Sequence, residues 1–572
     1  MKKINRFKYY ATIGFLAFNF IGCGEAVDIM DSDNVIIDDE QKKEGGVELG
    51  NVSPEVLEGE LKGGIGLALD FDSHKYQYQR ANNIDVFSGY FTVAKSKFDY
   101  GPALYHTYYY PNGYYNGPIG ESKKLYPQLY HAYFFGEEHG NPEWKAIAEI
   151  IYAYNMQELV DFFGAIPYND YRNLKETNPL EYLSTEETYK AIFNDLEEAI
   201  NILKTTKPSA EKLRKVEGDT GGYSKLDWKN WVKFANSIRL RMALNMVKIQ
   251  PGEAQIIAEN AVNDEIGVLD NEDFGLPHQA EITQHPLYQI CSVWNDSRLG
   301  ASLENIMKRY HNPLLEKWFS PNEDPIKSAS NGKQTLPAKN TCLGIRQGTA
   351  VFPTSNINGY RSFSKFKDQY MPRTYFKVTE VLFLRAEGAL RGWSMNGTAK
   401  DLYYQGIKKV FDENAIDGYD KYIEQKTADN SIVFKDYHQP EYSVLDPTRG
   451  VQVGVKWEDS DTEEVMLEKI ITQKYIAIFP NSAEAWTTFR RTGYPRLFPV
   501  PEDNAWPDGS FDVELQLRRI PYDESSSTDQ SNIGAIEAAL GGDNTAGLRL
   551  WWDVPTEGRD ENNRIIPKNF GF

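Results

Sequence analysis

The sequence predicts a mainly α-helical protein in which stacked helical hairpins carry long irregular loops within a single large domain. Three observations support this fold class. Several segments space their apolar residues with the helical period, these segments follow one another in pairs, and no linker divides the chain beyond about residue 60. Hydrophobic residues make up 41% of the 572 residues, which is enough for a sizeable core.

The first 22 residues have the pattern of a secretory signal. Lys2, Lys3, Arg6 and Lys8 precede an apolar run at residues 11–22. At about 1.5 Å per residue this run is roughly 18 Å long, whereas the hydrocarbon core of a bilayer is about 30 Å thick. We therefore expect residues 1–22 to act as a signal peptide that does not span the membrane.

The apolar run ends in Phe20-Ile21-Gly22-Cys23, which resembles a bacterial lipobox. In that motif a small residue precedes a cysteine whose sulfur receives a diacylglyceryl group before cleavage. We predict lipidation at Cys23 and attachment to a membrane, because several acyl chains hold a protein firmly on a bilayer. The alternative is an ordinary signal peptide with a chance cysteine.

Residues 23–60 are rich in Asp and Glu and contain several glycines, so we expect an acidic tether before the folded domain at residues 61–572. The whole chain has a formal net charge of −20 and a pI of about 5.0. Nucleic-acid binding needs clustered Lys and Arg. The acidic balance therefore argues against nucleic acid as the main partner.

Three helices have clear boundaries. Asn141-Pro142 predicts a helix start, and this helix stops near Gly164. Ser184 and Glu187 form a capping-box pattern at the start of the next helix, and a third helix spans roughly Asp227 to Val247. Further helices are predicted at about 252–263, 301–318, 375–391, 398–413 and 463–479. Between about 320 and 372, and again after 415, the chain is irregular, and long ordered loops are usually functional.

The sequence contains no recognisable enzyme signature. A nucleophile elbow, a phosphate-binding loop and a dinucleotide fingerprint are all missing. His131 and His139 lack the spacing of a zinc-binding helix, and the acidic turn at 459–464 lacks the central glycine of a calcium loop. We predict no enzymatic activity, no cofactor and no metal, with paired carboxylates for glycoside cleavage as an open alternative.

Five segments have distinctive sequences: KYQYQRANNIDVFSGY (75–90), FFGAIPYNDY (162–171), WVKFANSIRLRMAL (231–244), YFKVTEVLFLRAEGALRGW (375–393) and ITQKYIAIFPNSAEAWTTFRRTGYPRL (471–497). Together they resemble the SusD/RagB family of outer-membrane lipoproteins, particularly its SusD-like nutrient-binding branch. The resemblance covers nearly the whole mature chain, and the block at 473–495 is its most specific part.

The resemblance implies a fold and a role. Its fold is a frame of four tetratricopeptide-like helix pairs, with loops that build a ligand site on one face. Its role is performed at the outside of the outer membrane, above a SusC-like TonB-dependent barrel transporter, where such proteins capture oligomeric nutrients. Most are linked to oligosaccharides and some to peptides, so a peptide ligand is one alternative and a surface glycoside hydrolase is another.

A tyrosine-rich loop, YHTYYYPNGYYNGP at residues 105–118, is the first candidate for a glycan platform. Tyrosine offers an apolar ring for the C–H face of a sugar and a hydroxyl for its polar edge, and prolines restrict the loop, which lowers the entropy lost on binding. Packing against the helices and contact with the transporter are alternatives. The candidate residues are Tyr108, Tyr109, Tyr110, Asn112, Tyr114, Tyr115 and Asn116.

Two further loops combine an aromatic ring with groups that bind hydroxyls. SVWNDSR contains Trp294, Asn295 and Asp296, and TSNINGYRSF contains Tyr360 and Arg361. We include all five residues as candidate ligand-binding residues. A purely structural role for each loop is the alternative.

Other prominent residues are predicted to be structural. Arg490 and Arg491 are interpreted as charge partners that join helices, and Trp228 and Trp231 as core residues on an apolar helix face. Cys291 and Cys342 could form a disulfide in an oxidising compartment or stay as buried thiols. The sequence leaves that choice open.

Overall fold

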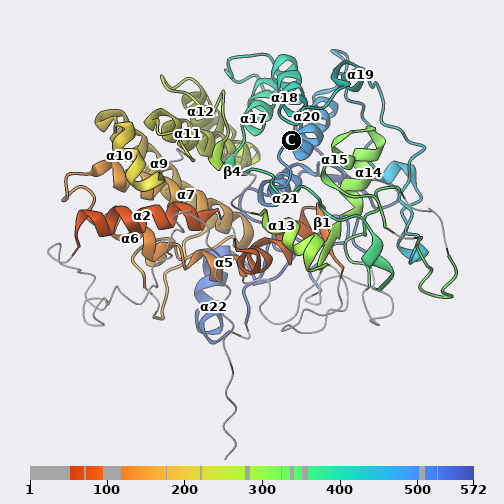
Figure 1. Cartoon of the computed structure of the whole chain (residues 1–572), viewed down its shortest axis with the longest axis horizontal. Coiled ribbons are helices and arrows are strands. Elements are labelled where there is room, and N and C mark those ends of the chain that lie inside the picture. The colour runs from red at the N-terminus through yellow and green to blue at the C-terminus, as the bar shows by residue number, and fades with distance from the viewer. Residues whose placement is uncertain are drawn as a thin grey trace, which may run out of the picture.

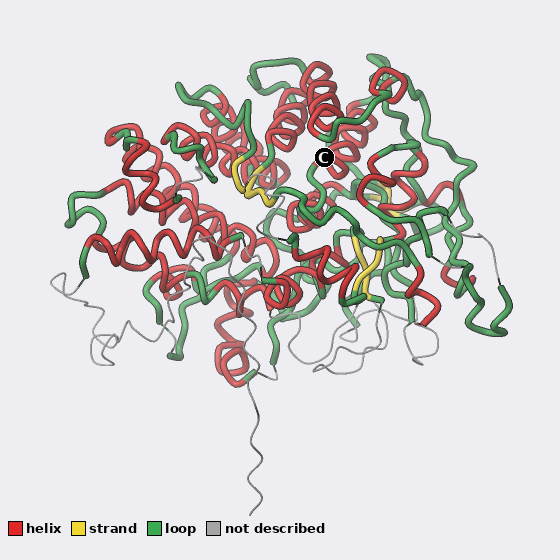
Figure 2. The backbone as a smooth tube through the Cα atoms, viewed as in Figure 1, coloured by secondary structure: helices red, strands yellow, loops and turns green. Residues whose placement is uncertain are grey.

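The structure is a computed structural model that describes residues 52–69, 72–94, 108, 117–175, 177–218, 222–276, 284–323, 325–334, 340–350, 358–501, 509–524 and 526–571. The predicted signal peptide, Cys23 and most of the predicted tether lie outside these residues. Helices dominate the described part, and its strands are short (Figure 2).

Four antiparallel helix pairs form the frame, which confirms the mainly α-helical fold class. They are α2 (Pro54–Ala68) with α6 (Tyr126–Phe135), α7 (Pro142–Phe163) with α9 (Thr185–Thr206), α11 (Trp228–Asn245) with α12 (Pro251–Val262), and α17 (Val378–Leu390) with α18 (Ala399–Glu413). Each pair contacts the next, through α6 and α7, α9 and α11, and α11 and α17. The pairs therefore follow one another in an arc from the left of Figure 1 to its top.

Local sequence signals set the ends of these helices. Pro142 occupies the first turn of α7, and Gly164 follows the helix with a φ of 89°, a conformation that strains side chains other than glycine. In α9, Ser184 accepts a bond from the backbone of Glu187 while the Glu187 carboxylate accepts one from the backbone of Ser184. This is the predicted capping box, and it satisfies donors that the helix leaves without partners.

The remaining helices connect the frame to the loops. They are α3 (Ser73–Tyr76), α4 (Ile84–Phe87), α5 (Gly117–Ser122), α8 (Tyr168–Arg172), α10 (Ala210–Glu217), α13 (Pro286–Tyr288), α14 (Ala301–Arg309), α15 (Leu314–Trp318), α19 (Tyr419–Ile423), α20 (Glu463–Ala477), α21 (Ser482–Thr492) and α22 (Ser527–Leu540). Loops prevail on the right of Figure 2, beside α14 and α15.

The described part of the chain contains three two-stranded antiparallel sheets, of which the first two join segments distant in the sequence and the third is a local hairpin. The sheets are β1 (Phe91–Val93) with β3 (Ser297–Leu299), β2 (Phe274–Leu276) with β4 (Arg373–Phe376), and β5 (Gly558–Arg559) with β6 (Ile565–Ile566). In the first sheet Thr92 faces Arg298, and Val93 faces Ser297.

Two expected boundaries differ from the structure. Helix α2 begins at Pro54 with Leu57 fully buried, so the folded part starts inside the segment predicted as tether. The single helix expected at 301–318 is two helices, because Pro313 has no N–H to donate and cannot continue a helix.

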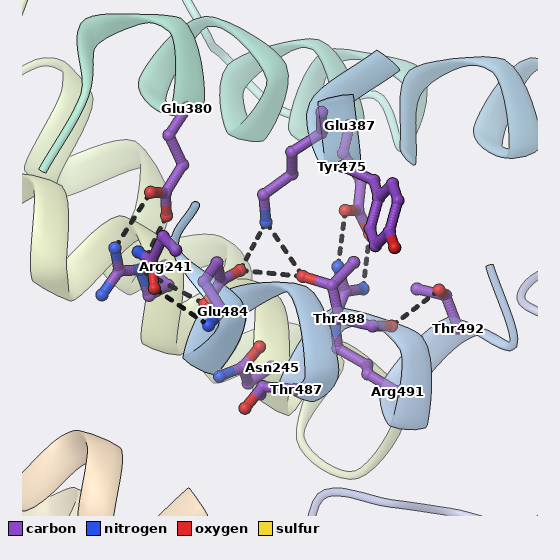
Figure 3. Close-up of polar contacts among 12 residues, drawn as sticks. Arg241, Asn245, Glu380, Glu387, Tyr475, Glu484, Thr487, Thr488, Arg491 and Thr492 are labelled. Carbon is purple, nitrogen blue, oxygen red and sulfur yellow. Dashed lines mark hydrogen bonds and ion pairs between the residues drawn. The ribbon is translucent and has the colours of Figure 1, made fainter. Parts of the chain in front are cut away.

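A buried network of charged residues joins four helices, and Figure 3 shows its polar contacts. The guanidinium of Arg241 on α11 binds both carboxylate oxygens of Glu380 on α17, at 2.7 and 3.0 Å, and lies 3.3 Å from Glu484 on α21. Lys474 on α20 donates to Glu484 and, at 3.1 Å, to Thr488. These segments belong to the sequence blocks that carry the family resemblance, and their charges pair inside the frame.

A second ion pair extends this network. Arg491 donates from two nitrogens to the carboxylate of Glu387, each at 2.7 Å, and Arg391 donates to the same carboxylate at 2.9 Å. Both arginines hold the pKa of Glu387 at about 2 although burial acts to raise it. The predicted structural role of Arg491 is confirmed. Arg490 is not the charge partner that the sequence predicted. Its guanidinium packs 3.6 Å from the Trp486 ring centre and forms no ion pair among the described residues.

The remaining structural predictions can be placed. Trp231 is fully buried and donates to Glu217 at 2.8 Å, which confirms it as a core residue. Trp228 is only half-buried and packs against the edge of the core. Cys291 and Cys342 are buried free thiols, so the structure contains no disulfide between them.

Among the described helices, none combines the length and the apolar character needed to cross a bilayer. The described residues also contain no cluster of three or more His, Cys, Asp or Glu side chains placed to hold a metal ion.

Candidate ligand-binding site

Two of the predicted loops meet in one cleft. A cavity of about 960 Å³ is lined by Trp294 and Asn295 from the first loop and by Gly359, Arg361 and Ser362 from the second. The two loops lie far apart in the sequence. Their convergence in a single cavity is the main result for the candidate site.

Trp294 is held at this cleft by regular structure on both sides. It follows the π-helix Gln289–Val293 and precedes strand β3. Asn295 has a φ of 62°, a left-handed conformation that Asn tolerates better than most residues. The turn at Asn295 leaves the Trp294 side chain half-buried, with its ring centre 4.5 Å from that of the exposed His74.

Arg298 joins the two loops from beneath. Its side chain is fully buried and donates to the Arg361 carbonyl at 2.7 Å and to the Asn295 side-chain oxygen at 3.2 Å. It also donates to the carbonyls of Cys291 and Ser297. None of these acceptors carries a full charge, and burial lowers the pKa of Arg298 to about 10.

Glu323, a third segment at residues 325–334, and His438 also line the wall. The His438 imidazole lies against Gly359 so closely that a Cβ at this position would sit 2.0 Å from a ring carbon. The ring also makes a hydrogen bond to the Lys327 carbonyl. His438 therefore connects the loop of Arg361 to the third segment, and only glycine fits between them.

The cleft presents both charge signs and one aromatic surface. Lys365 forms an ion pair with Glu323 at 2.7 Å, while Lys327 and Arg361 add positive groups to the wall. The Arg361 side chain is exposed. A ring beside several hydrogen-bond donors and acceptors can hold a ligand that has both an apolar face and polar edges.

Tyr108 does not offer the exposed ring that the sequence predicted. It is fully buried, with its ring centre 5.2 Å from that of Phe87 and 5.7 Å from that of Phe511. Its hydroxyl accepts a hydrogen bond from the backbone N–H of Leu517 at 3.2 Å. Tyr108 therefore anchors its loop to the core.

Two other predicted ligand groups are also turned inward. Tyr360 is fully buried and donates to the Asp436 carboxylate at 2.6 Å. Asp296 is 5% exposed and accepts a bond from the Gln77 side chain at 2.7 Å. Both fix the loops that carry Arg361 and Trp294.

The other residues predicted in the tyrosine-rich loop lie outside the described residues: Tyr109, Tyr110, Asn112, Tyr114, Tyr115 and Asn116.

Sequence reasoning missed several residues of the cleft. Glu323, Lys327, Lys365 and His438 line the cavity, and His74 lies beside Trp294 outside the lining. All five stand in segments where nothing in the local pattern marks a ligand group. The one available signal was position, because Glu323 and Lys327 fall in the irregular stretch that begins near residue 320. The position of His74 and His438 near the cleft depends on the folded structure and could not be predicted from the sequence around them.

Comparison with known proteins identifies the family. A family model described as SusD-like, the SusD and RagB outer-membrane lipoproteins, matches residues 30–553. No curated protein matches the sequence. Solved structures of SusD homologues do match this chain, with a similar fold and over a similar length.

Three of the similar structures illustrate this likeness. A chitin-binding SusD homologue from Flavobacterium johnsoniae is 30% identical, with a TM-score of 0.69, and the match covers 87% of this chain and 99% of the other. A SusD homologue from Bacteroides thetaiotaomicron is 28% identical over 87% and 98% of the two chains, with a TM-score of 0.71. A homologue from Bacteroides uniformis is 26% identical over 88% and 100%, with a TM-score of 0.73. The chain therefore belongs to the SusD-like family of outer-membrane lipoproteins.

Proposed function

We propose that this protein captures an oligosaccharide in the cleft beside Trp294 and delivers it to a SusC-like TonB-dependent transporter, without catalysing a reaction. The observation that carries the proposal is the half-buried Trp294 ring, which lines the same cavity as Asn295 and Arg361. A sugar ring can stack its C–H face on the indole while its hydroxyls bind the polar groups around it. The chitin-binding homologue supports a carbohydrate ligand.

We also propose that the protein lies on the exterior of the outer membrane, held by acyl chains on Cys23. Membership of a family of outer-membrane lipoproteins supports this location. The lipobox-like sequence before Cys23 supports the anchor. The tether then keeps the cleft close to the transporter.

Replacement of Trp294 by Ala tests the glycan site. Binding of the purified protein to a panel of oligosaccharides, with chito-oligosaccharides included, is measured by calorimetry. We expect at least one glycan to bind, and Trp294→Ala to weaken its binding about tenfold or more, because burying a large apolar side chain contributes roughly 1.5–3 kcal/mol.

Trp228→Ala is the matched control. Trp228 is also half-buried but lies on α11 and does not line the cleft. It should lower thermal stability without changing affinity. Equal affinity of the Trp294→Ala variant and the unchanged protein for the bound glycan would refute the site.

A peptide ligand is the second candidate, and the charged wall favours it. Glu323, Lys327, Arg361 and Lys365 could pair with the charged groups of a peptide. The same titrations therefore include short peptides of mixed charge. Peptide binding that Arg361→Ala abolishes, with no glycan binding, would replace the oligosaccharide proposal.

A further inference from the structure

A second cavity has a positive lining although the protein as a whole is acidic. It measures about 80 Å³ and lies where the end of α21, Lys248 and the C-terminal β5–β6 region meet. It shares no lining residue with the cleft of Trp294. Five arginines on its wall form ion pairs: Arg449, Arg491, Arg496, Arg518 and Arg564.

Three further cations on this wall, Lys248, Arg490 and Lys568, form no ion pair among the described residues. Arg490 is 2% exposed, and its guanidinium donates only to neutral oxygens, those of Trp486, Thr487 and Arg518. The half-buried Lys248 donates to the Thr556 hydroxyl at 2.9 Å. Neither charge is neutralised by a direct contact.

The acids of the region are already engaged. Asp553 pairs with Arg518 at 2.6 Å, Glu514 pairs with Arg449, and Glu557 pairs with Arg549. Burial is the main cause that lowers the pKa of Lys248 to about 8, and it lowers the pKa of Arg490 to about 9. Burial therefore costs both cations free energy that nearby carboxylates, Asp553 among them, offset only in part.

One buried donor on the wall also lacks a partner. The Arg491 side chain is 1% exposed and its two terminal nitrogens bind Glu387, but its Nε has no hydrogen-bond partner among the described residues. A buried N–H without an acceptor is uncommon in folded proteins. An acceptor supplied from outside the chain would satisfy it.

We propose that this cavity binds one small tetrahedral oxyanion, of the size and charge of phosphate or sulfate. At about 80 Å³ the cavity is well above the roughly 10–15 Å³ that a single water needs, so it has room for one such anion. Arginine and lysine donors suit oxyanions, and the bonds are strengthened by charge. The anion would supply the missing counter-charge for Lys248 and Arg490 and hold the C-terminal hairpin against α21.

Inorganic phosphate is the probe for the test. The purified full chain is titrated with phosphate in calorimetry, and its melting temperature is followed in phosphate and in chloride at matched ionic strength. We expect one phosphate per chain, competition by sulfate, and a higher melting temperature in phosphate. Absence of binding at millimolar phosphate, or equal competition by acetate, would overturn the assignment of a tetrahedral oxyanion.

Lys248→Met is the variant and Lys377→Met is its control. Lys377 is also half-buried, its pKa is also lowered by burial, and it donates to two backbone carbonyls away from this cavity. Lys248→Met should weaken phosphate binding at least tenfold. Lys377→Met should leave it unchanged even if the variant is less stable. Equal phosphate affinity of the two variants would overturn the proposal.

Discussion

The guanidinium of Arg298 donates a hydrogen bond of 2.7 Å to the backbone carbonyl of Arg361, and this contact joins the two loops that form the candidate cleft. The same guanidinium reaches Asn295 beside Trp294. A buried cation that binds neutral acceptors on both loops thus sets the distance between the aromatic and the charged side of the site.

Replacement of Arg298 by Met should therefore damage both stability and binding. Four acceptors lose their donor, and the expected loss in the free energy of unfolding is about 2–3 kcal/mol. Affinity for the bound ligand should fall as well, because Trp294 and Arg361 are no longer held in register. Chemical denaturation and calorimetry measure the two effects. Arg361→Met is the control: it removes an exposed side chain and should weaken ligand binding with little change in stability. If Arg298→Met left ligand affinity unchanged, the two loops would act independently and the prediction would fail.

Replacement of Glu387 by Gln should destabilise the frame by about 3–5 kcal/mol, since it leaves Arg491 buried with no full counter-charge. The pKa of Glu387 is about 2 in the folded protein, below its ordinary value of 4.5. Its contribution to stability is therefore present above pH 4.5 and is lost as the pH falls toward 2. Urea unfolding between pH 3 and pH 7 should show a flatter acid limb for the variant. A loss of stability that is equal at pH 3 and pH 7 would contradict this assignment.

Replacement of Glu149 by Gln should stabilise the protein, and more so at higher pH. Glu149 lies fully buried on α7, and burial raises its pKa to about 9. The unfolded chain releases this proton near pH 4.5 whereas the folded chain keeps it, so the stability of the unchanged protein falls between these values as the pH rises. Gln removes that penalty. Melting temperatures at pH 5 and pH 8 test this, with the exposed Glu211→Gln as a control that should show no such trend.

Replacement of Cys23 by Ala should release the protein from membranes, because it removes the only site proposed to carry acyl chains. Fractionation is best done in cells that lack the partner transporter, so that attachment through a protein contact is excluded. The variant should then appear in the soluble fraction. Its persistence in the membrane fraction would argue against lipidation at Cys23.

Much of the helical frame could be predicted from sequence because its signals are local. The capping box at Ser184 and the Pro142 and Gly164 boundaries of α7 depend only on neighbouring residues. Helix α2 was missed because its sequence, PEVLEGELKGGIGLA, contains four glycines, which disfavour a helix. Burial of Leu57 and Leu61 against other elements overrides that preference.

The site was harder to predict because it depends on distant contacts. Trp294 and Arg361 could be proposed from the sequence because each is prominent in a polar turn, but their meeting in one cavity depends on the buried Arg298. The prediction of an exposed Tyr108 ring was wrong, because the sequence of a tyrosine cluster does not show which ring packs in the core. In the structure Tyr108 packs against Phe511. His438 was missed because its packing against Gly359 joins segments far apart in the chain.

The walls of the cleft come from loops and from the short 3-10 helix that carries Arg361, whereas the buried charges of Figure 3 belong to α11, α17, α20 and α21. Recognition and architecture are therefore encoded by separate sets of residues. Substitutions confined to the loops should therefore alter which ligand fits the proposed site and leave the buried ion pairs of the helices unchanged.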